Sequence, residues 1–434
     1  MTEIRGLSSR NSARAGDMAE GRALLKKAYL IFVLCLIMPA GCGMNDELYM
    51  PDDLTGVQVS VSGADSGSVG KERSVLFDEK EYEEKRLSAG LTPDRLEAVK
   101  QSSRGLYYFD HMDPSLADLY AEIYVILEGH GSDVLISAKD EEALGDAFVC
   151  VLNDHPEIYW TEGYSYSRYL KTGKTYYTLS GKYTYSPEEC EYYDEKIRAA
   201  TEKLLSGISS YSGEYGKTKG VYEKIIKNTV YDKDARDNQN IISVLIYGRS
   251  VCQGYAKSVQ YLLGQMGVEC TVVTGKIKDG TGHAWNLVKV DGEYYYLDAT
   301  WGDEEYRSLN GEKAVPGRDI SYDYLNVTFE DIKDTHVADP DIDLPECVAT
   351  DANYYVEEGL FFRDYNEKEL AKIFKKADAE GKDYAAFRCC DDECYELFKQ
   401  TLIENKRIFD VLPEGSETVD YTTNDRARIL CFMF

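Results

Sequence analysis

The sequence predicts an α+β protein whose centre combines a helix with an antiparallel hairpin. After Cys252, apolar residues recur at helical spacing until Gly267, which supplies a stop. Residues 281–290 and 293–301 then read as two strands, joined by the Asp291-Gly292 pair typical of a two-residue hairpin turn. Regions on both sides of this centre also mix helical stretches with strands, which places the whole chain in the α+β class.

The composition excludes some classes of function. With 434 residues we expect two to four domains, and 43% hydrophobic residues are enough to build packed cores. The 49 basic and 77 acidic residues give a formal net charge of −28. Because a surface this negative repels the phosphate backbone, we expect no nucleic acid among the partners.

The N-terminal residues predict export. Lys26 and Lys27 precede an apolar run over residues 28–39, which is shorter than the roughly 20 residues of a transmembrane helix. Small residues then lead to Cys42, so we expect a signal peptide over 1–41. The segment resembles a bacterial lipobox, in which the cysteine carries the lipid, although Pro39 stands where that pattern usually has Leu. A signal cut elsewhere, which would release a secreted protein, is the alternative.

The segments next to this signal are assigned by composition. The basic flank begins late, so we expect Met18 to be the start and the first 17 residues to be an upstream extension. Residues 42–84 are rich in Gly, Ser and Asp and poor in large apolar residues. This composition predicts a flexible linker between the membrane and the folded body.

Residues 85–207 predict an α+β lead-in domain. Helical spacing covers 96–109, 115–127, 141–152 and 188–205, and aromatic and polar residues alternate over 164–169 and 175–184 as in a hairpin. We expect the histidines of this region, His111, His130 and His155, to be surface or packing residues, since none lies beside a candidate nucleophile.

After an acidic linker around 339–345, residues 346–434 predict a small C-terminal α/β domain. Strand-like and helix-like stretches alternate in the order β-α-β-α-β over 354–362, 367–379, 384–389, 394–404 and 427–434. Its Cys389, Cys390 and Cys394 lack a fourth ligand nearby, so we expect a structural role and no metal.

Cys252 is the candidate nucleophile. Ser250 and Gln253 fit a capping box with Ser250 as N-cap, which would make Cys252 the second residue of the helix. The unpaired N–H groups there favour a thiolate and can bind the oxyanion formed when it attacks a carbonyl. The alternative is an inert buried cysteine, the commoner fate of a single Cys.

The hairpin brings a histidine and an aspartate together. A two-residue loop after Val290 sets Trp285 opposite Asp298 and His283 opposite Thr300. His283 and Asp298 therefore share a face as diagonal neighbours, about 7–8 Å apart at the backbone. A carboxylate there can orient the imidazole and stabilise its charged form, which with Cys252 supplies the groups of thiol acyl transfer.

Three motifs in this order resemble the bacterial transglutaminase-like superfamily: Val251-Cys252-Gln253-Gly254-Tyr255-Ala256, Gly282-His283-Ala284-Trp285-Asn286 and Tyr296-Leu297-Asp298-Ala299-Thr300-Trp301. The later Tyr322–Asn326 segment and His336 are similar to the stretch that follows this core, and Asp154–Glu157 is similar to the lead-in of exported members. The resemblance implies a papain-like fold for residues 208–338.

By position, the resemblance makes Cys252 the nucleophile, His283 the base and then acid, and Asp298 the orienting residue. Gln253, Trp285 and Trp301 would shape the site, with capping favoured over an oxyanion role for Gln253. Family members include peptidases, amidases and protein cross-linkers, and we expect no metal or other cofactor.

The leading hypothesis is an exported enzyme, lipid-anchored at Cys42 on the outer face of the bacterial membrane, that hydrolyses amide bonds of a protein or peptide, such as a cell-wall peptide. Transamidation and a non-catalytic surface binding or scaffold protein are the alternatives.

Overall fold

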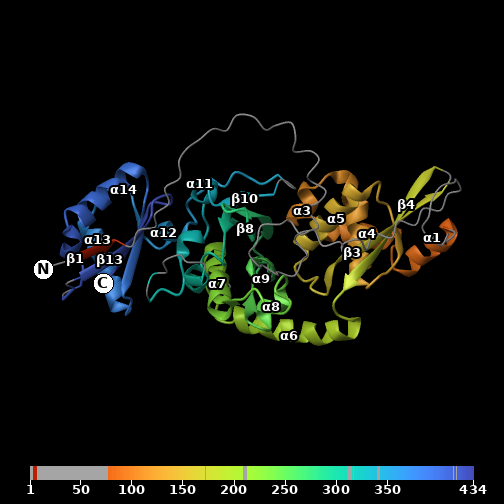
Figure 1. Cartoon of the computed structure of the whole chain (residues 1–434), viewed down its shortest axis with the longest axis horizontal. Helices are drawn as coiled ribbons and strands as arrows, with labels where there is room; N and C mark the ends of the chain where they lie inside the picture. Colours follow the sequence, from red (N-terminus) through yellow and green to blue (C-terminus); the bar gives the residue numbers. More distant parts are fainter. Residues whose placement is uncertain are drawn as a thin grey trace, which may run out of the picture.

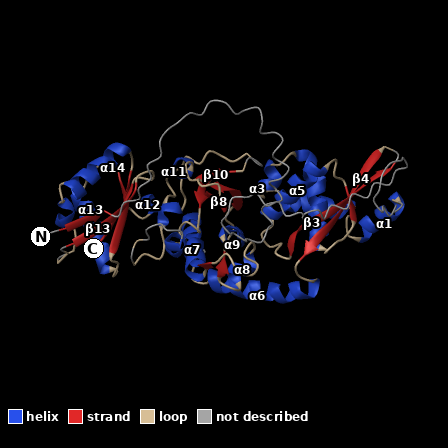
Figure 2. Cartoon of the chain, viewed as in Figure 1, coloured by secondary structure: helices blue, strands red, loops and turns tan. Residues whose placement is uncertain are grey.

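The computed structural model describes residues 3–6 and 77–434, apart from 172, 209–212, 310–314, 316, 340–342, 414 and 417. The predicted signal peptide, Cys42 and most of the predicted linker lie outside the described residues. Along the long axis of Figure 1, the lead-in region stands at one end, a central region follows, and the C-terminal region stands at the other end. Figure 2 shows that each of the three contains both helices and strands, and the α+β class is confirmed.

The lead-in region packs helices against a three-stranded sheet of order β2-β4-β3. Its elements are α1 (Glu79–Ser88), α2 (Pro93–Ser102), α3 (Tyr107–His111), η5 (Pro114–Leu116), α4 (Ala117–Glu128), β2 (Val134–Ile136), α5 (Glu141–Asp154), β3 (Thr161–Lys171) and β4 (Lys174–Tyr183).

Two predicted boundaries of this region were wrong. The linker expected to run to residue 84 ends earlier, because the Asp78 carboxylate caps α1 by accepting a hydrogen bond from the Lys80 N–H at 3.0 Å. The single helix expected over 96–109 is two helices, because Gly105 adopts φ +91° between α2 and α3, a conformation that ends a helix.

The central region places α9 against a four-stranded antiparallel sheet of order β10-β7-β8-β9. Its elements are α6 (Pro187–Leu205), α7 (Gly213–Asn228), β5 (Val230–Tyr231), α8 (Ile241–Leu245), β6 (Arg249–Ser250), α9 (Cys252–Gln265), β7 (Cys270–Ile277), β8 (Gly282–Val290), β9 (Glu293–Leu297), α10 (Glu304–Leu309), η6 (Tyr322–Tyr324), α11 (Phe329–Ile332) and β10 (His336–Ala338).

The hairpin between β8 and β9 has the predicted register. Asn286 lies opposite Leu297 and Val290 opposite Glu293, which are the pairs a two-residue loop requires. Asp291 and Gly292 take φ +51° and +90°, the positive values of a type I′ turn. Asp298 directly follows Leu297, at the open end of the hairpin. The register therefore places its carboxylate near the end of β8 that carries His283.

Two hydrophobic cores hold α9 and the sheet in place. One core, formed by α7, α8, α9 and strands β8 and β9, includes Tyr222, Tyr255 and Leu297, and α6 contributes Ile197 to it. The other joins the lead-in helices to the sheet and includes Trp285. The Tyr108 hydroxyl also donates to the Val272 carbonyl at 2.9 Å, a buried bond that ties α3 to β7.

The C-terminal region forms a five-stranded sheet of order β1-β13-β14-β12-β11, with helices packed on it. Its elements are β1 (Glu3–Gly6), α12 (Tyr354–Glu357), β11 (Phe361–Phe362), α13 (Glu367–Ala379), β12 (Tyr384–Cys389), α14 (Asp392–Lys399), the π-helical turn η7 (Gln400–Glu404), η8 (Arg407–Asp410), β13 (Thr418–Asn424) and β14 (Ile429–Met433).

The predicted order of this region needs two corrections. Residues 354–362 are a short helix and a two-residue strand rather than one strand, because Asn353 caps a helical turn there. The sequence analysis also missed β13, which pairs with β14. Among the described residues, none of the helices is both long enough and apolar enough to cross a membrane, and the described cysteines are free thiols.

Candidate active site

Cys252 is the first residue of α9, and its surroundings differ from the predicted capping box. The N-cap is Val251, and no side chain caps the helix. Ser250 lies one residue earlier, in β6, where its hydroxyl bonds the Ser243 hydroxyl at 2.6 Å and donates to the Asn238 carbonyl at 3.0 Å. The prediction failed because β6 pairs with β5 and draws Ser250 into that ladder.

Gln253 therefore has no capping role. It is the second residue of α9, and its Oε1 atom is buried without a hydrogen-bond partner among the described residues. In the first main-chain hydrogen bond of α9, the Tyr255 N–H donates to the Val251 carbonyl at 3.1 Å. The N–H groups of the first turn before Tyr255, including that of Cys252, therefore have no partner within the helix, as at any helix start.

His283 and Asp298 lie together, as the hairpin register predicts. The Nε2 atom of His283 bonds Oδ2 of Asp298 at 2.6 Å, and both residues are 4% exposed. Burial alone lowers the pKa of His283, but the Asp298 carboxylate and the Cys252 thiol outweigh it and raise this pKa to about 10. The pKa of Asp298 is raised by burial and lowered more strongly by His283 and His336, so the carboxylate stays ionised.

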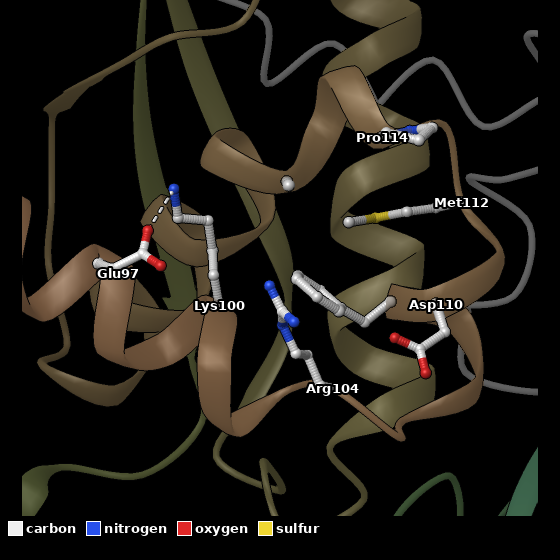
Figure 3. Close-up of a pocket in the computed structure, with 8 residues that line it drawn as sticks. Glu97, Lys100, Arg104, Asp110, Met112 and Pro114 are labelled. Atoms are coloured by element: carbon white, nitrogen blue, oxygen red, sulfur yellow. Dashed lines mark ion pairs between the residues drawn. The ribbon is translucent and has the colours of Figure 1, made fainter.

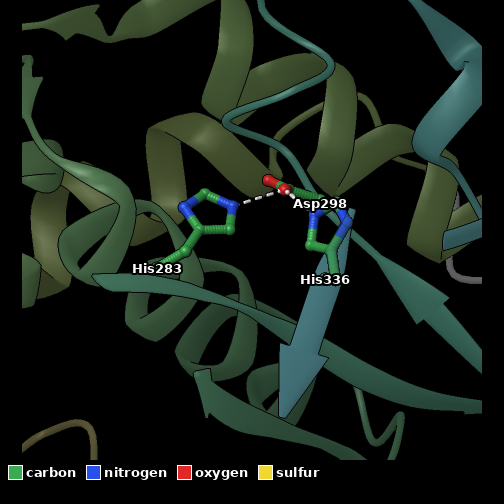
Figure 4. Close-up of side chains that lie close together, drawn as sticks. All are labelled: His283, Asp298 and His336. Atoms are coloured by element: carbon green, nitrogen blue, oxygen red, sulfur yellow. Dashed lines mark hydrogen bonds and ion pairs between the residues drawn. The ribbon is translucent and has the colours of Figure 1, made fainter. Parts of the chain in front are cut away.

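The Asp298 carboxylate accepts four hydrogen bonds. Oδ1 accepts from the backbone N–H groups of Thr300 and Trp301, at 2.9 and 3.0 Å. Oδ2 accepts from His283 and also lies 3.0 Å from Nε2 of His336. Figure 4 shows the two imidazole rings on either side of this carboxylate. The turn after β9 and the two rings together fix the position of the carboxylate.

His336 is the residue that the sequence analysis did not assign to the site. It begins β10, which pairs with β7, and its side chain is fully buried. The resemblance of His336 and of the segment before it to the family was a signal, but nothing in the sequence pattern places β10 beside Asp298.

Trp285 and Trp301 form aromatic walls around the two imidazoles. Their ring centroids lie 5.9 and 6.1 Å from that of His283. Trp285 is 2% exposed, while Trp301 is half-buried. The side chain of Cys252 is half-buried and interacts with His283. The thiol is thus the accessible end of a line that continues inward through His283 to Asp298.

Three possible ligand atoms lie close together at the buried end of the site. One ligand atom each from His283, Asp298 and His336 lie within 4.8 Å of one another. Imidazole and carboxylate are ligands that Zn²⁺ accepts. The bonds at 2.6 and 3.0 Å show that these atoms already pair with one another, and our expectation of a metal-free enzyme stays a prediction.

A separate hollow of about 570 Å³ opens on the lead-in region (Figure 3). It is lined by Glu97, Lys100, Arg104, Phe109, Asp110, Met112, Pro114 and Ala117. Within it, Lys100 pairs with Glu97 at 3.0 Å. These residues come from α2, α3, η5, α4 and their connections, so the hollow is distinct from the line of Cys252, His283 and Asp298.

Residues 198–299 match the family model of the Transglutaminase-like superfamily. This central part of the chain is similar to the transglutaminase-like superfamily. This transglutaminase-like segment runs from within α6 to just beyond Asp298 and contains Cys252 and His283, whereas His336 lies outside it. The match supports a thiol enzyme of this superfamily. No curated protein matches the chain.

Solved structures resemble parts of the chain. A TGase crystal structure shares 15% identity and a TM-score of 0.24, covering 32% of this chain and 52% of that one. A candidate protease from Parabacteroides distasonis shares 16% identity and a TM-score of 0.20, covering 30% and 29%. A candidate cysteine protease from Cytophaga hutchinsonii shares 12% identity and a TM-score of 0.21, covering 31% and 61%. The chain thus spans less than two thirds of each.

Proposed function

We propose that the chain is a thiol hydrolase that cleaves amide bonds of a peptide or protein through an acyl-enzyme on Cys252. In this proposal His283 is the base and then the acid, and Asp298 holds His283 in position. The observation that carries the proposal is that His283 interacts with Cys252 and, through Nε2, bonds Asp298 at 2.6 Å. This is the arrangement that activates a nucleophile through an oriented imidazole.

The reaction follows from these contacts. His283 takes the proton of Cys252, and the thiolate attacks the carbonyl carbon of the substrate amide. The N–H groups at the start of α9 stabilise the oxyanion. The imidazolium of His283 then gives its proton to the leaving amine, and the C–N bond breaks. Water, deprotonated by His283, attacks the thioester and releases the acid, which frees the Cys252 thiol.

The first test is site-specific. The protein is treated with iodoacetamide at pH 6.5, and alkylation of the peptide containing Cys252 is quantified by mass spectrometry against the peptide containing Cys390, another half-buried cysteine. We expect Cys252 to react at least 10-fold faster, and its Cys252→Ala variant to lose hydrolysis of a peptide library. Equal rates for the two thiols, or equal hydrolysis by both proteins, would sink the proposal.

Transamidation is the second candidate, and one observation favours it. His283 and Asp298 are each 4% exposed behind the Trp285 and Trp301 rings, so little water reaches the base. A site that excludes water lets an amine compete as the acyl acceptor. Incorporation of a biotinylated amine into a glutamine-bearing protein, lost in Cys252→Ala, would support transamidation; release of acid alone would support hydrolysis.

We also propose that the enzyme acts outside the cell, anchored by a lipid on Cys42. The sequence alone supports this, through the basic flank, the apolar run and the small residues before that cysteine. In a bacterial host, the wild-type chain should label with an alkyne fatty acid and sediment with membranes, whereas Cys42→Ser should do neither. Labelling of both proteins would contradict the anchor.

A further inference from the structure

The proposed reaction uses one imidazole, but the site contains two. Nε2 of His336 lies 3.0 Å from Oδ2 of Asp298, the oxygen that Nε2 of His283 approaches to 2.6 Å. The His336 side chain is fully buried and does not reach the thiol in any described contact. A residue so placed acts on the reaction through Asp298.

The neighbours of His336 fix which nitrogen carries its proton. Asp298 is ionised and only accepts, so Nε2 of His336 must be the donor. Burial lowers the pKa of His336 more than Asp298 raises it, and the ring is therefore neutral, with Nδ1 unprotonated. The Thr335 hydroxyl lies 2.9 Å from Nδ1 and can donate to it. The result is a neutral N–H donor aimed at the carboxylate.

The sheet is built to bring His336 this close. Gly275 on β7 pairs with Ala338 on β10 and with His283 on β8. A Cβ atom at Gly275 would lie 2.2 Å from the Val337 carbonyl oxygen and 2.9 Å from Cα of Ala338. Only a residue without a side chain lets β10 approach to this distance, so the glycine sets the position of His336.

Aromatic rings enclose the second imidazole. The ring centroid of His336 lies 4.8 Å from that of Trp301, 5.1 Å from that of Trp285 and 5.4 Å from that of His283. Such packing holds the His336 ring in one orientation. The Asp298 carboxylate therefore accepts from two imidazoles in a region of low dielectric, where hydrogen bonds are stronger than in water.

We propose that His336 is a positioning residue that shares the Asp298 carboxylate with His283 and thereby limits how tightly Asp298 holds the proton of His283. The inference rests on the proposed function. Because His283 must give its proton to the leaving amine, a carboxylate that held this proton too strongly would slow the acid step. His336 offsets part of that hold by donating to the same oxygen.

Other titratable or charged groups also surround His283, Asp298 and His336. Those facing His283 and Asp298 are Cys252, Tyr222 and Tyr231, and those facing His336 are Arg426 and Tyr324. Burial raises the pKa of Tyr222 and of Tyr231 above its usual value, so both stay neutral over the working range. Arg426 pairs with Asp334 at 3.1 Å.

The test follows His283 directly. Because the chain has only 5 His residues, ¹⁵N-histidine NMR can resolve each ring. His336→Phe keeps an aromatic ring but removes the donor, whereas His336→Gln keeps an N–H at the same reach. In the wild type about half of the His283 rings should be neutral at pH 10, given its pKa of about 10.

We expect His336→Phe to raise the titration midpoint of His283 by about one pH unit, the scale on which one hydrogen bond to a charged group acts. About one tenth of the His283 rings would then be neutral at pH 10. His336→Gln should return the midpoint most of the way to that of the wild type. A midpoint unchanged in the Phe variant, or shifted equally by Phe and Gln, would overturn the proposal.

A second, more conservative variant keeps the test valid if His336→Phe does not fold. Thr335→Val removes the hydroxyl beside Nδ1 of His336 without a change of shape, and should move the His283 midpoint in the same direction by a smaller amount. No movement in a folded Thr335→Val variant, alongside an unfolded His336→Phe, counts against the proposal. Iodoacetamide labelling of Cys252 in the same wild-type sample separates the two hypotheses. An unreactive Cys252 contradicts the proposed function, whereas the NMR midpoints decide the role of His336.

Discussion

At the scale of single residues, Asp298 is the centre of the site, since its carboxylate accepts two backbone N–H groups and two imidazoles. A buried carboxylate would be costly without such partners. Its pairing with His283 therefore contributes to the stability of the fold as well as to the proposed chemistry, and the two contributions have different dependences on pH.

The first prediction concerns that dependence. Folded His283 keeps its proton to about pH 10, whereas a histidine in the unfolded chain releases it near pH 6.5. A raised pKa stabilises the fold fully below the unfolded value, and this contribution is lost as the pH rises through the folded value. The melting temperature of the wild type should therefore exceed that of His283→Gln most at pH 6, and the gap should narrow by pH 9.5. A gap that widens with pH would contradict the assignment.

A second prediction concerns glycines on α9. A Cβ at Gly254 would lie 2.0 Å from Oγ of Ser250 and 2.8 Å from Oγ of Ser243, because the start of α9 packs directly on that loop. Gly254→Ala should destabilise the protein by about 1–3 kcal/mol and slow the alkylation of Cys252. Denaturant unfolding and iodoacetamide labelling measure the two effects.

Gly264 on the same helix is the matched control, since a Cβ there meets no atom of the described residues within 4 Å. Gly264→Ala should stabilise the protein by about 0.5–1 kcal/mol through helix propensity. Equal effects of the two substitutions would show that the close packing at Gly254 does not position Cys252.

The sequence was enough to select Cys252, His283 and Asp298 as candidate site residues, but not to predict the contacts around them. Cys252 at a helix start and the His283–Asp298 pair were predictable because helical period and hairpin register are local rules. The predicted capping box was wrong because Ser250 belongs to β6, whose pairing with β5 depends on tertiary structure rather than on the local sequence. His336 was unassigned for the same reason, since its approach to Asp298 depends on how a distant strand pairs.

At the scale of elements, the sequence predicted two of the four strands of the central β10-β7-β8-β9 sheet. Strands β8 and β9 alternate and are joined by a recognisable turn, whereas β7 was missed because its residues 271–275 are buried in succession and show no alternation. The three residues of β10 are too few to show any period. Both missing strands are the ones that carry His336 to the site.

The third prediction tests that strand. Gly275→Ala should push β10 away from β7, because the added Cβ would lie 2.2 Å from the Val337 carbonyl oxygen. We expect a loss of about 1–3 kcal/mol in the free energy of unfolding and at least a 10-fold loss of activity. Gly282→Ala lies beside His283, but its added Cβ would meet nothing within 4 Å in the described part of the chain, so this variant should change stability little. A Gly275→Ala variant as stable as Gly282→Ala would contradict the close approach of β10.

At the scale of the whole molecule, the C-terminal region is joined to the centre by a buried ion pair. Arg388 on β12 donates to Asp331 on α11 at 2.8 Å, and both side chains are under 10% exposed. The Tyr355 hydroxyl and the Asn424 amide also bond Asp323. Since α11 leads within four residues to His336, the C-terminal region supports the segment that completes the site.

The fourth prediction follows from that ion pair. Arg388→Met leaves Asp331 buried without its cation and should lower the free energy of unfolding by about 3–5 kcal/mol. Arg407→Met, in the same region, removes a surface pair with Glu367 and Asp410 and should have little effect. Urea unfolding of both variants decides: similar midpoints would show that the buried pair does not join the regions.

The most direct measurement is the pH dependence of Cys252 alkylation in wild type and in His283→Ala, read from the Cys252 peptide alone. If Cys252 and His283 work as a pair, iodoacetamide should label the wild type rapidly at pH 6, where an isolated thiol is almost fully protonated, and the variant should be at least 10-fold slower there. Slow labelling of both proteins at pH 6, rising together toward pH 9, would contradict the account and leave the site without an activated thiol.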